Sequence, residues 1–260
     1  MKNLTYFFLI SYFSSCIISC AKEDGSSEAS TWHSTRNIGT SSDFVKKVTL
    51  ESSANYFSLE QTNIGLERNI NLGSDDIFLV KHNSPGSKKW TEQLRISDNE
   101  SGISLVVDSF ENIYVTGYTK GVLDGNTNSV NYDVFLEKYN SSGIKQWTKK
   151  LGKSSTNHGI GMTLDSFDNL YVTGFSNRFL DRRIHKGGEE IVLMKYNLFG
   201  TKQWTKNLGI HASEFKLDVI LESSDNIKVI GFANSIFDEN FDHLNKNFFL
   251  VKYNLDGVLQ

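Results

Sequence analysis

Four histidines are the side chains of this sequence best suited to chemistry: His158, His185, His211 and His243. Neutral imidazole binds metal ions and acts as a general acid or base near neutral pH, and Glu189 or Asp242 could join such a group. None of the four stands in a ligand motif of the HxxxH type, and histidine is common in polar loops. The sequence therefore favours solvated loop residues over a metal or acid–base site.

Three aspartates recur at a fixed interval, each directly after an apolar residue: Asp124, Asp181 and Asp238. Carboxylates in equivalent loops could bind cations, but an Asp beside an apolar residue also forms ordinary turns. We expect the turn role. The same loops carry further polar residues that are candidates for contacting a binding partner: Asn126, Arg182, Arg183 and Asp242.

A second acidic group, Asp165–Asn169, resembles a fragment of a calcium-binding loop. It lacks the alternating spacing and the terminal Glu of an EF-hand loop, so we expect a tight turn. The sequence contains no GxSxG, Walker, GxGxxG, CxxC or HExxH motif. It therefore predicts no catalytic residues, no bound metal and no cofactor. A hydrolase or lyase that uses the histidines is the alternative.

These candidates belong to a repeat. Trp90, Trp147 and Trp204 are each 57 residues apart, and longer segments recur with the same period. One segment occurs four times, as Ile77–Asn83, Val134–Asn140, Ile191–Asn197 and Phe248–Asn254. Repetition over this much of a chain predicts a repeat architecture.

Each unit contains four strand signals that are separated by turn residues. In the second unit they are Ile103–Val107, Ile113–Tyr118, Asp133–Tyr139 and Ile144–Lys149. Runs of consecutive apolar residues, such as Leu105 to Val107, need cover on both faces of a sheet, as in blades stacked around an axis. We therefore predict an all-β, β-propeller-like fold, in which each repeat forms a four-stranded antiparallel blade.

Three elements of the repeat resemble a known family. The Asn112–Gly117 strand with Asp108 and Ser109 before it, the Val134–Asn140 strand and the strand from Gly143 to Trp147 are similar to the bacterial SBBP beta-propeller repeat. This repeat is found in exported proteins and lipoproteins. The resemblance covers most of residues 32–260 and implies a propeller without implying an activity. The family is usually pictured with seven blades, and this chain departs from that number.

Counted from tryptophan to tryptophan, the repeat domain at 32–260 divides into units 32–89, 90–146, 147–203 and 204–260. Two arrangements remain open. The Trp32 segment could supply the fourth strand of the last unit and close a four-bladed ring, which removes exposed edges. Alternatively, the chain is an incomplete or truncated version of a larger propeller. An open arc would expose apolar sheet faces at both ends and promote self-association.

The first residues predict an export signal. Lys2 precedes an uncharged, mostly apolar run of 15 residues, Leu4–Ile18. That run is shorter than a bilayer span, which needs about 20 residues. It ends in Ile17-Ile18-Ser19-Cys20, which resembles the bacterial lipobox. The resemblance implies a signal peptide at 1–19 and lipid modification of Cys20, and the polar segment 20–31 is predicted to be a flexible tether.

These features suggest where the protein acts. Loss of Cys16 with the signal peptide leaves Cys20 as the only cysteine, so no disulfide is expected. An acylated Cys20 would hold the protein on a lipid bilayer, and Ala21, in place of Asp after the cysteine, favours the outer membrane. The net charge of −3 gives no indication of nucleic-acid binding. We expect a non-enzymatic scaffold whose loops around 122–132, 179–189 and 236–247 bind a protein or glycan.

Overall fold

The computed structural model describes residues 43–50, 55–62, 76–84, 86–94, 100–119, 132–154, 161–176, 189–212, 217–222, 226–233 and 247–260. These residues form strands and turns and contain no helix. None of these residues belongs to a helix that could cross a membrane. The strands build four antiparallel sheets, which confirms the predicted all-β, propeller-like class.

In each sheet, or blade, the strands follow one another in chain order. Blade 1 contains β1 (Asp43–Leu50), β2 (Tyr56–Thr62), β3 (Asp76–His82) and β4 (Lys88–Leu94). Blade 2 contains β5 (Glu100–Val107), β6 (Ile113–Thr119), β7 (Tyr132–Tyr139) and β8 (Lys145–Ser154). Blade 3 contains β9 (Met162–Leu164), β10 (Leu170–Ser176), β11 (Glu189–Tyr196) and β12 (Lys202–Ala212). Blade 4 contains β13 (Leu217–Glu222), β14 (Asn226–Ala233) and β15 (Asn247–Asn254).

Blade 2 has the four strands predicted for the second unit. The main difference lies in β8, which was predicted to end at Lys149 and runs to Ser154. Its pairing with β7 continues past a bulge as far as Ser154, which lies opposite Tyr132. Cross-strand pairing therefore extends the strand beyond the apolar signal in the sequence.

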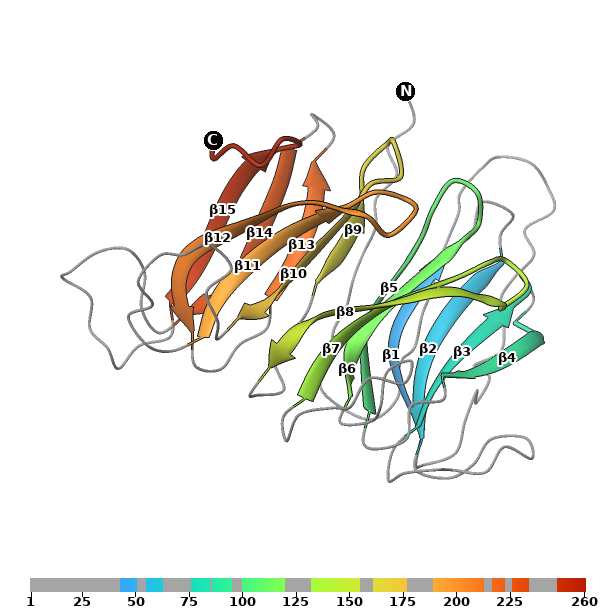
Figure 1. The fold of residues 1–260 in the computed structure, drawn as a ribbon. Coiled ribbons are helices and arrows are strands. Elements are labelled where there is room, and N and C mark those ends of the chain that lie inside the picture. The colour runs from blue at the N-terminus through green and yellow to red at the C-terminus, as the bar shows by residue number, and fades with distance from the viewer. Residues whose placement is uncertain are drawn as a thin grey trace, which may run out of the picture.

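Apolar side chains fill the spaces between neighbouring blades. Ile77 and Leu79 of blade 1 pack with Phe135 of blade 2, and equivalent clusters join blades 2 and 3 and blades 3 and 4. The first strands β1, β5, β9 and β13 contact one another in turn, so they lie innermost, and the blades fan out side by side (Figure 1). Blades 2 and 3 are thus covered on both faces, as the consecutive apolar residues predict.

The four blades do not close a ring in the part of the chain that is described (Figure 1). Blade 4 has three strands there, and one bridge between Tyr253 and Leu259 begins a fourth. We define the outer face of blade 4 as the side turned away from blade 3; it carries the exposed residues Ile220, Phe248 and Leu250. The face of blade 1 that is turned away from blade 2 is buried at Phe78 and Val80. The expectation of exposed end faces therefore holds at blade 4 and is wrong at blade 1. Trp32, the proposed closing residue, lies outside the described residues.

Candidate functional site

Most residues that the sequence singled out lie outside the described part of the chain. They are Cys20, Asp124, Asn126, His158, Asp181, Arg182, Arg183, His185, Asp238, Asp242 and His243. His211 lies on β12, where its backbone pairs with that of Glu190 on β11. Among the described residues, no group of three or more His, Cys, Asp and Glu is arranged to hold a metal ion.

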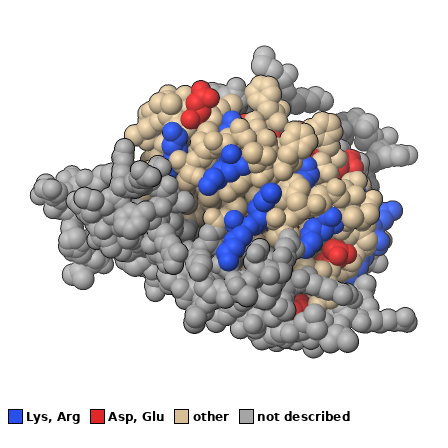
Figure 2. All heavy atoms as spheres, in the orientation of Figure 1, with Lys and Arg blue, Asp and Glu red and all other residues tan. Residues whose placement is uncertain are grey.

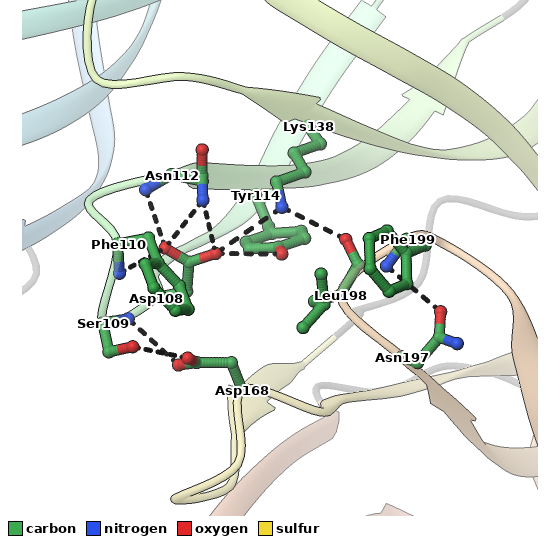
Figure 3. Close-up of polar contacts among 10 residues, drawn as sticks. All are labelled: Asp108, Ser109, Phe110, Asn112, Tyr114, Lys138, Asp168, Asn197, Leu198 and Phe199. Carbon is green, nitrogen blue, oxygen red and sulfur yellow. Dashed lines mark hydrogen bonds and ion pairs between the residues drawn. The ribbon is translucent and has the colours of Figure 1, made fainter.

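The most elaborate polar site in the described blades is built around Asp108, in the turn between β5 and β6 (Figure 3). One oxygen of its buried carboxylate accepts hydrogen bonds from the backbone N–H groups of Phe110 and Asn112, at 3.0 and 2.8 Å. The Asn112 amide donates to both carboxylate oxygens, and the Tyr114 hydroxyl donates at 3.1 Å. The Asp-x-x-x-Asn-x-Tyr spacing therefore gives a buried carboxylate a full set of donors.

The same site also joins blade 2 to blade 3. Lys138 on β7 lies with its Nζ 3.6 Å from Asp108 and donates to the Leu198 carbonyl of blade 3 at 3.1 Å. In addition, the Ser109 N–H and hydroxyl both donate to Asp168, in the turn between β9 and β10 (Figure 3). We call this Asp–Lys–carbonyl arrangement the clasp. A buried charge pair of this kind is costly to break, because loss of one partner leaves the other charge unpaired.

The clasp recurs between blades 3 and 4. Asp165 accepts from the backbone of Phe167 and Asn169, from the Asn169 amide and from the Tyr171 hydroxyl. Lys195 lies 3.8 Å from Asp165 and donates to the Leu255 carbonyl at 3.2 Å. The structure confirms the tight turn predicted at Asp165–Asn169: this carboxylate is occupied by protein donors.

Burial and charge govern the tyrosines of these interfaces. Burial, and next the neighbouring Asp108 carboxylate, raise the pKa of the Tyr114 hydroxyl. Burial raises the pKa of Tyr196 to about 12. Both hydroxyls therefore stay neutral across the physiological range and serve as hydrogen-bond donors.

Blade 4 replaces the clasp with an exposed version. Glu222 stands where blades 2 and 3 have Asp, and Lys228 replaces their tyrosine and donates to Glu222 at 2.7 Å. This hydrogen bond is the main cause that lowers the pKa of Glu222. Lys252, the counterpart of Lys138, lies 3.6 Å from Glu222 and is 38% exposed, against 9% for Lys138. The clasp lysine is thus buried only where a further blade covers it.

Blade 1 contains a different polar group, which includes a serine, a histidine and a carboxylate. The Ser58 hydroxyl donates to Glu60 at 2.6 Å and lies 3.1 Å from Nε2 of His82. The His82 ring stacks on Tyr56, and its Nδ1 has no hydrogen-bond partner among the described residues. All of Ser58, Glu60 and His82 are buried, and Glu60 faces the serine rather than Nδ1. A hydrolytic triad needs its carboxylate to orient the histidine, and the nucleophile must reach substrate. This arrangement provides neither.

Short turns form one end of the blades, which we call the turn edge. It comprises the turns between first and second strands, at 108–112 and 165–169, and those between third and fourth strands, at 140–144 and 197–201, with the equivalent turn at 254–258. In the second kind, an Asn side chain accepts from the backbone four residues on, as Asn140 does from Ile144, and a glycine follows at positive φ. Gly143, at φ 81°, also lies close to Trp90 of the preceding blade, which leaves little room for a side chain.

The turn motif, the Tyr-containing second strand and the Trp of the fourth strand are the elements of a recognised repeat. Residues 89–124 match the SBBP beta-propeller repeat.

Two curated relatives contain sequence similar to this chain. Regulatory protein FlaEY of Caulobacter vibrioides is 27% identical over 167 residues, which is 58% of this chain and 18% of that protein. An uncharacterised WD repeat-containing protein of Acanthamoeba polyphaga mimivirus is 25% identical over 198 residues, 63% of this chain and 14% of that protein. The chain thus spans less than a fifth of the length of either relative.

Solved structures with a similar outline include two enzymes. A luciferin-regenerating enzyme has a TM-score of 0.44 at 12% identity, covering 82% of this chain and 62% of that one. A glycoside hydrolase family 43 arabinoxylan arabinofuranohydrolase from Bacillus subtilis has a TM-score of 0.45 at 14% identity, covering 84% of this chain and 48% of that one. Similarity at this level carries no information about activity.

The buried group in blade 1 was missed at the sequence level, although a signal existed. Ser58 and Glu60 stand where blades 2 and 3 have Val and Gly, and His82 stands where the other blades have Tyr. Three departures in one blade mark a local specialisation. That they meet in space depends on the pairing of Tyr56 with His82 across β2 and β3, which places all three side chains on one face.

Proposed function

We propose that this chain is a non-enzymatic binding scaffold, anchored in the bacterial cell envelope through an acylated Cys20. The observation that carries the proposal is the clasp. Asp108 and Asp165 are saturated by donors of their own blade, and the paired Lys138 and Lys195 each donate to a carbonyl of the adjacent blade. These buried charges therefore maintain a frame, and a stiff frame is suited to holding binding loops in fixed positions.

The binding residues are proposed to lie on the connections between second and third strands. These segments, at 122–132, 179–189 and 236–247, differ most between otherwise matching units. Because β6 and β7 pair antiparallel, their connection leaves the blade at the end opposite to the turn edge. The proposed contacts are Asp124, Asn126, Asp181, Arg182, Arg183, Asp238 and Asp242. Such charged and amide side chains suit a protein or a glycan.

Replacement of the three loops by Gly-Ser segments of equal length tests the proposal. Binding of residues 21–260 to a glycan array and to isolated envelope proteins is compared before and after replacement. We expect specific binding by the wild type and its loss in the loop variant, with an unchanged urea midpoint as the folding control. Equal binding by both proteins would count against the loops as the binding site.

Two further measurements separate the parts of this proposal. Cys20→Ser is expected to abolish incorporation of labelled palmitate and to release the protein from the membrane fraction; continued labelling would disprove acylation at that residue. Metal analysis of the purified protein, with His158→Ala and His211→Ala variants, tests the hydrolase or lyase alternative. Stoichiometric metal that these variants lose would favour the enzyme.

A further inference from the structure

Large hydrophobic side chains are exposed in two places on the described surface. Three lie on the outer face of blade 4. Six others lie in or directly beside the turns of the turn edge, and Leu50 is the last residue of β1, the first strand of blade 1. These seven are 55% to 72% exposed: Leu50, Phe110, Ile144, Phe167, Phe199, Val258 and Leu259. Single exposed apolar residues are ordinary on a protein surface, but apolar residues gathered on one edge mark an interaction surface.

Contacts between blades hold these turns together as one edge. The hydrogen bonds from Ser109 to Asp168 join the turn that carries Phe110 to the turn that carries Phe167. The bond from Lys138 to the Leu198 carbonyl brings the turn that carries Phe199 against blade 2. Figure 3 shows these three turns meeting at the clasp, and in Figure 1 the turns lie toward the top and right of the blades.

The turns themselves do not require apolar residues at these positions. The other two repeats have Ser53 and Ser224 where Phe110 and Phe167 stand. Phe199 is likewise replaced by Ser142 in blade 2, in a turn with the same Asn hydrogen bonds and a glycine at positive φ. The 140–144 turn therefore forms with Ser142 where the 197–201 turn has the exposed Phe199. The role of the exposed Phe lies instead in what the edge contacts.

Lysines border the apolar edge. Lys88, Lys145 and Lys202 are the first residues of β4, β8 and β12, directly after the turns, and all three are exposed. Lys145 also lies 3.4 Å from Glu137. Figure 2 shows Lys and Arg side chains across the face of the blades that is turned to the viewer, with few acidic ones among them. Aromatic side chains with lysines behind them match the layering of a bilayer, in which acyl chains lie beneath anionic head groups.

We propose that the turn edge is a lipid-binding surface: Phe110, Phe167 and Phe199 enter the interface of an anionic bilayer while the flanking lysines contact its phosphates. This inference rests on the proposed function in one respect: the lipid anchor at Cys20 would place the protein beside a membrane. The 23 residues from Cys20 to Asp43 can reach at most about 80 Å when extended, several times the length of an eight-residue strand. The anchor therefore permits this edge to face the bilayer, and the connections at 122–132 and 179–189 would then point away from it.

A bilayer fits this edge better than a sugar polymer. Sugar recognition uses an aromatic face together with nearby hydrogen-bonding groups. Three carboxylates near the exposed rings are already occupied: Asp108 and Asp165 by the clasp, and Asp168 by Ser109; Glu111, which follows Phe110, is not one of them. Aliphatic residues, Ile144 and Val258 among them, accompany the rings, and lipid accepts aliphatic and aromatic side chains alike.

Vesicle sedimentation of residues 21–260, which contain every described strand and all three apolar clusters, tests the proposal without the lipid anchor. The probes are vesicles of phosphatidylcholine with 30% phosphatidylglycerol (about one anionic lipid in three) and of phosphatidylcholine alone. We expect binding to the anionic vesicles that weakens in high salt. Phe110→Ser, Phe167→Ser and Phe199→Ser restore the residue that another repeat has at the same place, so the turns are retained. Each should weaken partitioning about tenfold.

The matched control is Phe248→Ser, which removes an equally exposed Phe from the outer face of blade 4 and should leave partitioning unchanged. Absence of wild-type binding, or equal binding by the triple Phe→Ser variant, would overturn the proposal. So would retention on a polysaccharide that the three substitutions abolish while vesicle binding persists. These results are independent of the loop replacement and of Cys20→Ser, so failure here is distinguishable from failure of the scaffold proposal.

Discussion

Equivalent leucines in different blades allow a direct test of which sheet faces are covered. Leu136 and Leu250 occupy the same repeat position, 114 residues apart, on β7 and β15. Leu136 is fully buried against blade 3, whereas Leu250 is 55% exposed on the outer face of blade 4. Substitution by Ala removes the same three carbon atoms at both places, so any difference in stability reports the surroundings.

The expected magnitudes follow from burial. Three buried carbons are worth about 2.4 kcal/mol, and a cavity that does not collapse raises the cost of Leu136→Ala to about 3–4 kcal/mol. At Leu250, where less than half of the side chain is covered and water fills the gap, the same change should cost about 1 kcal/mol. The predicted difference in unfolding free energy is therefore about 2–3 kcal/mol.

Urea unfolding of residues 21–260 measures this difference. Tryptophan fluorescence and far-UV circular dichroism are recorded together, because coincident transitions are required before midpoints are converted to free energies. Equal losses for Leu136→Ala and Leu250→Ala would refute the reasoning. That result would mean that the outer face of blade 4 is covered in solution as the inner faces are.

The remaining predictions concern the clasp, the buried tyrosines, the turn glycine and the open blade. Asp108→Ala should lower the unfolding free energy by about 3–5 kcal/mol, because its buried donors lose their acceptor, whereas the exposed Glu222→Ala should shift the urea midpoint far less. Burial raises the pKa of Tyr196 from 10.0 to about 12. The neutral hydroxyl therefore contributes fully to stability below pH 10, and this contribution is lost as the pH rises through 12. Tyr196→Phe should remove this part of the alkaline loss of stability in urea titrations. Gly143→Ala, at φ 81° and beside the Trp90 ring, should cost about 1–2 kcal/mol or more in the same assay. Finally, the exposed outer face predicts concentration-dependent self-association by sedimentation velocity, which Leu250→Lys should reduce; a monomer at all concentrations would exclude it.

Much of the fold follows from the sequence because its determinants are local. Each strand or turn is specified within a few residues, by an apolar run, an Asp-x-x-x-Asn turn or an Asn-x-x-Gly turn. The 57-residue period then repeats the same local structure in each blade. The prediction of tight turns at Asp108 and Asp165 was therefore confirmed in atomic detail. Cover on both faces was also predictable, since consecutive apolar residues on one strand point to opposite sides.

The candidate sites depend on contacts between residues that lie far apart in the sequence. The Lys138 partner in blade 3 lies 60 residues away, and Ser58 and His82 are 24 residues apart, so no local pattern identifies these contacts. Aromatic residues that recur with the repeat do not all lie in the core. Tyr114 and Tyr171 do, but Phe110 and Phe167, which have the same spacing, are exposed on the turn edge. Spacing alone does not distinguish the two pairs.

The sequence by itself therefore determined the strands, their order, the turns that join them and the need for stacked sheets, because backbone propensity and side-chain alternation act over short distances. Only the tertiary structure decided which sheet faces are covered, which carboxylates are paired with lysines at the interfaces between blades and which apolar residues are exposed to solvent. Those outcomes are set by the neighbouring blade, whose contacting residues lie outside the local sequence: Lys138 and Leu198 are 60 positions apart. An identical repeat position is accordingly buried at Leu136 and exposed at Leu250.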